Sequence, residues 1–357
     1  MQASRQKRVS VIIPALKRPD LTRRCVNSLL RQSLPATEYE IIVVENEAHP
    51  STVLPDPLPQ NVRRMDLVEN YGTTGSINRG VEDSSSEYIL LLNNDVELEP
   101  KFLATLISRL SNGHQYGFAT GKLLSATPPR DRLDGAGDAL VLGGGAFRLG
   151  NCDLDVGQFN DPRPMLAGCG AATMFRRSVF EEAGGLDEDF FAYLDDIDLA
   201  LRAQLLGHEG IYVPDAVAYH VGSATLGEPF HQKIVEWMTR NQILMLAKDY
   251  PGAVLVKLMP QIVVFQVLWF GKVLRHAKLL SYGTGIIEAM RTLPRALRKR
   301  NALMQRRRIT NADFLRLLRE SEKQVLEWEN TRPAASRSGL LKIYFGLFGK
   351  SCPTVEI

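Results

Sequence analysis

The chain has 357 residues, of which 45% are hydrophobic, so it can bury the core of one large domain or of two. Its 43 basic and 40 acidic residues leave a net charge of +3, which gives no reason to expect a nucleic-acid partner. The four cysteines, Cys25, Cys152, Cys169 and Cys352, have neither the paired spacing of a metal site nor the density of a disulfide scaffold, which favours a reducing, cytoplasmic compartment.

The predicted elements begin after a basic tail at residues 1–8, which lacks the apolar segment of a signal peptide. Apolar runs predict strands at residues 9–13, 40–45, 62–68 and 87–92, and helical spacing predicts helices between them and from residue 101. This alternation indicates an α/β fold: a doubly wound, mostly parallel sheet with helices on both faces, over residues 9–225. Right-handed crossovers then bring the strand-to-helix loops to one rim of the sheet.

The second half of the chain has a different character. Residues 127–164 are rich in Gly, Asp, Pro and Arg, which predicts loops or short strands over the binding face, where acceptor specificity is expected. Residues 226–330 are predicted to be helical and residues 331–357 to form a tail. The longest uncharged stretch, residues 258–271, is shorter than the ~20 residues of a spanning helix. The basic run at residues 291–308 is expected to contact an anionic membrane surface, and the alternative is a solvated helical face.

Two carboxylates, Asp95 and Glu97, follow the buried strand that ends at Leu92. Hard oxygen ligands at the carboxyl end of a strand suit a divalent cation that carries a diphosphate. A turn leading into the next helix is the competing explanation. His220 ends another short strand and is a candidate third ligand, although a lone histidine at a strand end is more often structural. Carboxylates with an imidazole suit Mn²⁺ well and Mg²⁺ adequately.

A second acidic cluster contains five Asp and one Glu between residues 187 and 198 and lies at the first turn of a predicted helix. Helix capping accounts for one or two of these acids. It does not account for the crowding of Asp195, Asp196 and Asp198, whose mutual repulsion calls for a cation or a role in proton transfer.

Taken in order, these motifs resemble glycosyltransferase family 2, with its GT-A fold, and within it the rhamnosyltransferase-like branch. The segments that carry the resemblance are residues 11–14 with Arg18, 42–46, 70–72 with Gly75, Asn78 and Gly80, 91–97, 168–170, 184–188 with Asp195, Asp196 and Asp198, and 219–222.

The resemblance implies roles for individual residues. Those expected to bind the nucleotide sugar are Pro14, Ala15, Arg18, Glu45, Asn46, Asn70, Gly72, Gly75, Asn78, Asn94, Asp95, Gly168 and Gly170. Those expected to hold Mn²⁺ or Mg²⁺ are Asp95, Glu97 and His220, with Asp196 as general base and Asp195 and Asp198 in support. The chain departs from the family pattern at Glu45 and Asp195, where Asp and Glu are usual, and in the Asp-x-Glu form of the metal motif.

The function implied is a metal-dependent, inverting transfer of a sugar to a hydroxyl of a glycan or lipid-linked acceptor in cell-surface polysaccharide synthesis. The expected donor is dTDP-rhamnose first and a UDP-sugar second. The expected location is cytoplasmic, peripheral on the cytosolic face of the inner membrane. One alternative is a catalytically silent nucleotide-sugar-binding scaffold. The other is a sugar nucleotidyltransferase, which is disfavoured because residues 14–18 do not form a Gly-rich phosphate loop.

Overall fold

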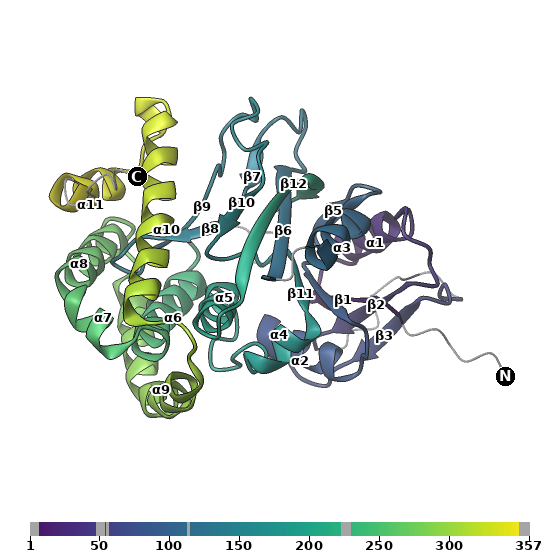
Figure 1. Ribbon diagram of the computed structural model, residues 1–357, viewed down its shortest axis with the longest axis horizontal. Coiled ribbons are helices and arrows are strands. Elements are labelled where there is room, and N and C mark those ends of the chain that lie inside the picture. Colours follow the sequence, from purple (N-terminus) through teal and green to yellow (C-terminus); the bar gives the residue numbers. More distant parts are fainter. Residues whose placement is uncertain (1–6, 48–53, 55–56, 113–114, 223–229, 350–357) are drawn as a thin grey trace.

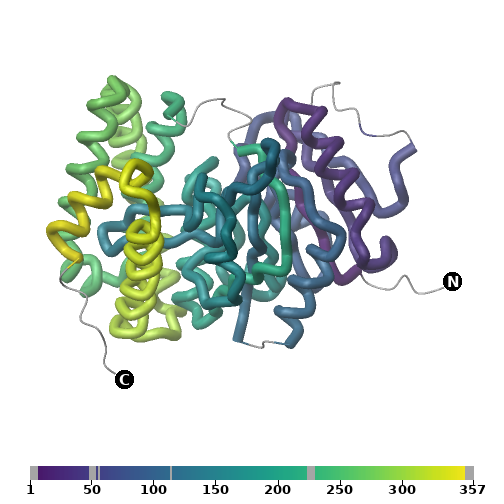
Figure 2. Tube along the Cα trace, turned by 90° about the horizontal axis from the view of Figure 1, so that it is seen from above, coloured from purple at the N-terminus to yellow at the C-terminus, as the bar shows by residue number. Residues whose placement is uncertain are grey.

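The computed structural model describes residues 7–47, 54, 57–112, 115–222 and 230–349. The strands form a central sheet with helices packed on it, and the C-terminal helices lie at the end of the molecule opposite the N-terminal strands (Figures 1 and 2). The boundary predicted near residue 226 and most of the N-terminal basic tail fall outside the described residues.

Four parallel strands make up the N-terminal half of the sheet, in the order β3-β2-β1-β4. They are β1 (Val9–Ala15), β2 (Tyr39–Glu45), β3 (Val62–Asp66) and β4 (Tyr88–Leu92). The apolar residues of β1, β2 and β4 are buried on both sides, as expected of parallel strands covered by helices, whereas β3 is an edge strand and is buried only at Val62. The carboxyl ends of these strands therefore meet at one rim.

Beyond β4 the sheet becomes mixed. The further strands are β5 (Val96–Leu98), β6 (Tyr116–Ser125), β7 (Leu133–Gly135), β10 (Arg163–Met165), β11 (Ala172–Arg176) and β12 (Glu209–His220). β11 runs antiparallel between β4 and β6, because the chain enters it through a loop at the rim, where Ala172 pairs with Leu92, and not through a helical crossover. This entry brings residues 168–170 to the rim. β8 (Asp138–Leu140) and β9 (Ala146–Arg148) form a separate two-stranded sheet.

Helices cover both faces of the sheet, which confirms the predicted fold class. They are α1 (Pro19–Leu29), α2 (Gly72–Glu82), α3 (Phe102–Asn112), α4 (Arg177–Glu182) and α5 (Asp195–Leu205). Alternate residues of β1 define the two cores: Ile12 packs in one core with Ile77 of α2, and Ile13 packs in the other with Leu29 of α1 and Phe102 of α3.

The C-terminal region consists of α6 (Gln232–Asp249), α7 (Gly252–Lys257), α8 (Met259–Arg275), α9 (Leu279–Arg306), α10 (Asn311–Thr331), the short 3₁₀ helix Ala334–Ser336 and α11 (Gly339–Phe348). α6 and α9 approach closely at Gly285, where a Cβ atom would lie 2.6 Å from the Glu236 carbonyl oxygen. α11 is packed on the protein through the buried Tyr344. Among the described residues, no helix combines the length and apolar character needed to span a membrane.

Residues 183–194, between α4 and α5, are called here the acidic loop. Part of the basic run on α9 faces this loop. Lys299 lies 2.5 Å from Asp187 and 2.7 Å from Asp189, and Arg295 lies 2.8 Å from Asp189. These cations join the C-terminal helices to the loop that precedes α5. The sequence offered membrane contact or solvation for this run, and these two side chains serve instead in ion pairs within the chain.

Candidate active site

Asn46, which follows β2, makes hydrogen bonds that hold a loop at the rim. Its side-chain N–H donates to Asn70 Oδ1 at 2.8 Å and to the Gly72 carbonyl at 3.2 Å, and its Oδ1 accepts from the Tyr71 N–H at 2.8 Å. This amide thereby fixes the loop that leads into α2. The free N–H groups at the start of a helix suit an anionic group such as a diphosphate. The structure brings together Asn46, Asn70 and Gly72 of the predicted donor-binding set.

Gly72 is required by a close approach of the acidic loop. Its φ is +69°, and a Cβ atom there would lie 2.3 Å from the Phe191 carbonyl oxygen. Thr74 N–H donates to that oxygen at 3.3 Å. Asn78 holds the same loop, because its amide donates to the Leu186 carbonyl at 2.8 Å and accepts from the Leu186 N–H at 3.0 Å. Its position indicates a role in holding the loop.

The other predicted donor-binding residues border the same rim. Ala15 is paired with the buried Glu45 across β1 and β2. Arg18 follows Pro14 after β1, has a left-handed backbone with φ 52°, and forms an exposed ion pair with Asp20 at 3.0 Å.

Three further predicted donor-binding residues lie against neighbouring side chains. Asn94 donates to the Thr22 hydroxyl at 2.9 Å. Gly168 packs so closely on Thr173 that a Cβ atom would lie 2.4 Å from its hydroxyl oxygen, whereas Gly75 would meet the Cβ of Tyr71 at 2.7 Å.

His220 lies between two carboxylates. Its Nε2 is 3.3 Å from Asp95 Oδ1, and its Nδ1 is 2.8 Å from Asp134 Oδ2. Pairing of β5 with β12 places His220 opposite Val96 and so next to Asp95. Burial acts to lower the pKa of His220, but hydrogen bonds to Asp134 and Asp95 outweigh it and raise that pKa to about 9.

Glu97 does not join this pair. Its carboxylate forms an ion pair with Arg24 and lies 4.0 Å from Arg130. Across the part of the chain that the structure describes, no three His, Cys, Asp or Glu side chains converge closely enough to hold a metal ion. Once His220 gives up the proton between its Nε2 and Asp95, these two residues offer a nitrogen and an oxygen donor that fit a divalent cation, and Asp134 behind the imidazole completes the carboxylate-histidine arrangement typical of metal sites.

Asp196 lies at the first turn of α5, facing the loop that leads into β11. Its Oδ2 accepts from the Gly170 N–H at 2.8 Å, and its Oδ1 accepts from the Ile197 N–H at 2.8 Å. Enclosure by the protein raises the pKa of the Asp196 carboxyl, although the charge of Arg148 and these N–H groups act in the opposite direction. The residue itself is half-buried and so keeps access to solvent. The Asp196 carboxylate is therefore fixed by two backbone N–H groups and is still accessible from solvent.

The neighbouring acids have different surroundings. Asp198 is completely buried, accepts from Arg202 Nη2 at 2.6 Å and forms an ion pair with Lys248. The sequence left open what offsets the repulsion among Asp195, Asp196 and Asp198. At Asp198 the negative charge is neutralised by Arg202 and Lys248. Asp195 is buried as well, and burial followed by the charge of Asp196 raises its pKa.

Arg148 lies between the Asp95–His220–Asp134 group and Asp196. It was not identified from the sequence. Its Nη1 lies 3.1 Å from Asp134 Oδ2, and its Nε lies 3.3 Å from Asp138 Oδ1. Its charge also acts on Asp196. Asp134 and Arg148 come from β7 and β9, in the Gly-rich segment for which the sequence predicted short strands and acceptor contacts. Their only sequence signal was the presence of charged residues in that segment.

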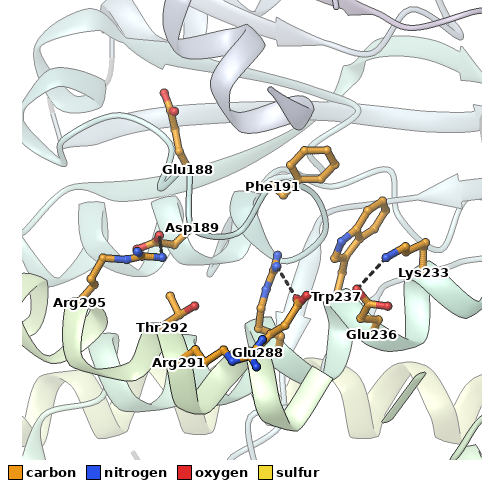
Figure 3. A pocket seen from close by; sticks show the side chains of 11 residues that line it. Glu188, Asp189, Phe191, Lys233, Glu236, Trp237, Glu288, Arg291, Thr292 and Arg295 are labelled. Carbon is orange, nitrogen blue, oxygen red and sulfur yellow. Dashed lines mark hydrogen bonds and ion pairs between the residues drawn. The ribbon is translucent and has the colours of Figure 1, made fainter. Parts of the chain in front are cut away.

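A pocket of about 600 Å³ lies between the acidic loop, α6 and α9 (Figure 3). Its lining residues are Glu188, Asp189, Phe191, Lys233, Glu236, Trp237, Arg240, Glu288, Arg291, Thr292 and Arg295. The Trp237 ring is 5.2 Å from Phe191 and 6.1 Å from Tyr193, centroid to centroid. An aromatic wall beside paired charges, such as Arg240 and Glu288 at 3.1 Å, suits a sugar with its apolar faces and hydroxyl groups.

Comparison with known proteins shows related sequences and folds. The chain is 38% identical over 204 residues to the N-acetylglucosaminyl-diphospho-decaprenol L-rhamnosyltransferase of Mycobacterium tuberculosis, covering 47% of this chain and 62% of that protein. It is 29% identical over 227 residues to the O-antigen biosynthesis protein RfbC of Myxococcus xanthus, covering 61% of this chain and 18% of that protein. The chain thus spans less than two thirds of the length of these relatives.

Among solved structures, GalNAc-T7 with UDP, GalNAc and Mn²⁺ superposes with a TM-score of 0.57 at 13% identity, covering 74% of this chain and 51% of that chain, which supports the GT-A fold. The model of the family described as "Glycosyltransferase like family 2" matches residues 6–239, which include the whole rim, the candidate base and the start of α6. The chain therefore belongs to glycosyltransferase family 2.

Proposed function

We propose that this protein is a metal-dependent, inverting glycosyltransferase that moves a sugar from a nucleotide diphosphate to a hydroxyl of a glycan or lipid-linked acceptor in cell-surface polysaccharide synthesis. The observation that carries the proposal is the position of Asp196. The Gly170 N–H holds its carboxylate at 2.8 Å, and enclosure raises its pKa toward the range in which a carboxylate is an effective base.

The proposed reaction is a single displacement. The acceptor oxygen attacks the anomeric carbon while its proton passes to the Asp196 carboxylate. The bond between the anomeric carbon and the phosphate oxygen breaks, and its electron pair leaves with the nucleoside diphosphate. Attack from the side opposite the leaving group inverts the anomeric centre. Asp195 is proposed to support the base by orienting it or by binding acceptor hydroxyls, and Asp198 by anchoring α5 to Lys248 of α6.

Asp95 and His220 would hold the divalent cation, Mn²⁺ first and Mg²⁺ second, and Glu97 is a ligand only if it leaves Arg24. When bound, such a cation neutralises the charge of the departing diphosphate. The residues of the chain orient the donor, because Asn46 and Asn70 fix the loop at the start of α2, and the start of a helix is the end that suits a diphosphate.

For the donor we propose dTDP-rhamnose, with a UDP-sugar as second choice. The printed name of the Mycobacterium relative, an L-rhamnosyltransferase, supports the sugar. That name also supports a lipid-linked acceptor, because it specifies a decaprenol diphosphate. The pocket beside Trp237 is the proposed site of the acceptor sugar. We further propose a cytoplasmic protein, peripheral on an anionic membrane surface.

A catalytically silent nucleotide-sugar-binding scaffold is the main alternative. A scaffold needs to bind the donor but needs no base fixed in position. The hydrogen bond from the Gly170 N–H to Asp196 therefore favours the glycosyltransferase over the scaffold. A sugar nucleotidyltransferase remains less favoured, because β1 is followed by Leu16, Lys17 and Arg18 in place of a glycine-rich phosphate loop.

The deciding experiment combines donor binding with transfer. Thermal-shift titrations of dTDP, UDP and their sugars, with Mn²⁺, with Mg²⁺ and with chelator, identify the donor. Product formation is then compared between the native chain and Asp196→Asn, which is expected to lower kcat by about 10³-fold with unchanged donor affinity. Asp215→Asn, at an exposed carboxylate, is the matched control. Donor binding without turnover in the native chain would establish the scaffold instead.

A further inference from the structure

One side of α8 exposes a stripe of large apolar side chains, called here the α8 stripe. Its members are between 41% and 62% exposed: Met259, Val263, Val267, Phe270 and Leu274. At 3.6 residues per turn they fall within an arc of about 80°. The other side of the helix packs on the protein through the buried Ile262, Phe265 and Val273. α8 therefore has two apolar sides, of which one is covered by the chain and one is open.

The stripe is the centre of a wider concentration of exposed apolar residues. In the described part of the chain, 18 large apolar side chains are exposed, and 11 of them lie between residues 256 and 297. Phe270 contacts Tyr282 of α9 with ring centroids 5.2 Å apart, which joins the stripe to the start of α9. Leu280, in the same turn, is 90% exposed. Scattered apolar residues need no explanation, but a cluster of this kind indicates a contact surface.

Charge identifies the partner that fits this surface. Residues 251–287 contain no Asp or Glu, and they contain Lys257, Lys272, Arg275 and Lys278. Lys257 before α8 and Arg275 in its last turn therefore place cations at the two ends of the stripe, whereas Lys272 lies over the Phe230 ring. Apolar side chains beside cations, on a helix too short to span a membrane, are the combination that lies in the headgroup region of an anionic bilayer.

We propose that the α8 stripe is the surface through which this protein binds an anionic lipid bilayer, with α8 lying in the plane of the membrane. The proposal rests on the membrane partner named under the proposed function and gives it a location, but it does not require the transfer reaction. It also differs from the membrane contact predicted for the basic run of α9, because Arg295 and Lys299 of that run are engaged by Asp187 and Asp189.

A second copy of the chain is a poorer occupant. A two-fold dimer across α8 places the same segment of both copies at one interface. The cations of residues 251–287 would then face one another, and no acid of that segment would pair with them. Phosphate headgroups supply the negative charge that a second copy lacks.

The test is co-sedimentation of the full chain with vesicles of phosphatidylcholine alone and of phosphatidylcholine with phosphatidylglycerol. The native protein is expected to sediment with the anionic vesicles at about 50 mM salt and less at about 500 mM. Val263→Glu/Val267→Glu is expected to lower the partition coefficient at least about tenfold. Phe270→Ser/Leu274→Ser repeats the test without adding charge. Val68→Glu/Val156→Glu, at positions 91% and 80% exposed, is the matched control and is expected to bind as the native chain does.

Three results would overturn the proposal: no binding of the native chain to anionic vesicles, equal loss in the control, or native binding by both stripe variants. Sedimentation velocity adds a fourth, a native dimer that both stripe variants dissociate, which would assign the stripe to a second copy. Nucleotide binding is measured on the same samples. Its retention shows that the variants are folded, whereas vesicle binding by a native chain that binds no nucleotide would remove the proposed function and leave this proposal standing.

Discussion

Replacing Gly170 with alanine tests the proposed base without removing its carboxylate. A Cβ atom at residue 170 would lie 2.7 Å from Asp196 Oδ2 and 3.1 Å from Asp196 Cγ. To reach an ordinary contact of 3.4 Å, the carboxylate oxygen must move by about 0.7 Å. Because a misplacement of about 1 Å can reduce catalysis about 10²-fold, we expect kcat to fall by about 10- to 100-fold. Donor affinity is expected to remain within about twofold, since the nearest contacts of the added Cβ are with Asp196; a larger loss would favour the nucleotide-sugar-binding role that the resemblance implied for Gly170.

The assay is steady-state transfer with the donor identified by thermal shift, together with calorimetric measurement of nucleotide affinity. Overpacking at this position costs about 1–3 kcal/mol, so thermal melting must show that Gly170→Ala is folded at the assay temperature. Gly283→Ala is the matched control, because no atom lies within 4 Å of the added Cβ. Full kcat in a folded Gly170→Ala protein would show that the position of Asp196 does not limit the reaction.

The remaining predictions concern the charges around the site. Asp134→Asn is expected to weaken Mn²⁺-dependent nucleotide binding about 10- to 100-fold in calorimetry, and unchanged affinity would remove its supporting role. Arg148→Met removes a cation that lowers the pKa of Asp196. Because the base acts only when deprotonated, activity falls as pH falls through that pKa, and this acid limb should move to higher pH in the variant; an unmoved limb would contradict the argument. Lys248→Met removes the buried cation that Asp187 and Asp198 share, leaving Lys299 and Arg202 as their partners, and should lower the free energy of unfolding by about 3–5 kcal/mol in urea titration. Lys342→Met, at an exposed side chain, should change it by less than about 0.5 kcal/mol.

The architecture follows from the sequence to a large extent. Runs such as that of β4 predict strands, and their alternation with helices predicts a sheet covered on both faces, as observed. The placement of Asp95 and Asp196 at the rim also follows, because Asp95 lies in the turn after β4 and Asp196 lies in the first turn of α5. The antiparallel direction of β11 does not follow, because strand direction depends on where the connecting loop enters the sheet and not on the apolar run itself.

Side-chain partners across the fold were less predictable. The Asp-x-Glu spacing suggested two ligands of one cation, but Arg24 of α1 is close enough to pair with Glu97. Asp134 comes next to His220 through the pairing of β6 with its neighbours β7 and β12, which no local pattern encodes. The proposed roles of these residues stay predictions. Their positions show that spacing along the chain defines which residues reach the rim, whereas contacts over long sequence distances define which of them meet.

The loop before the proposed base has a backbone that an isolated segment would not hold. Phe191, Tyr193 and Leu194 all have positive φ, between 60° and 68°, which is unfavourable for such side chains. The amide of Asn241, in α6, donates to the carbonyl oxygens of residues 190, 192 and 193 at 2.7–3.0 Å. Helix α6, which follows the sheet in the chain, thus sets the shape of the loop that leads to Asp196. Chimeras between relatives should therefore exchange this loop and α6 together. A chimera that takes only the loop would carry Asp196 without the Asn241 hydrogen bonds that fix the loop's backbone.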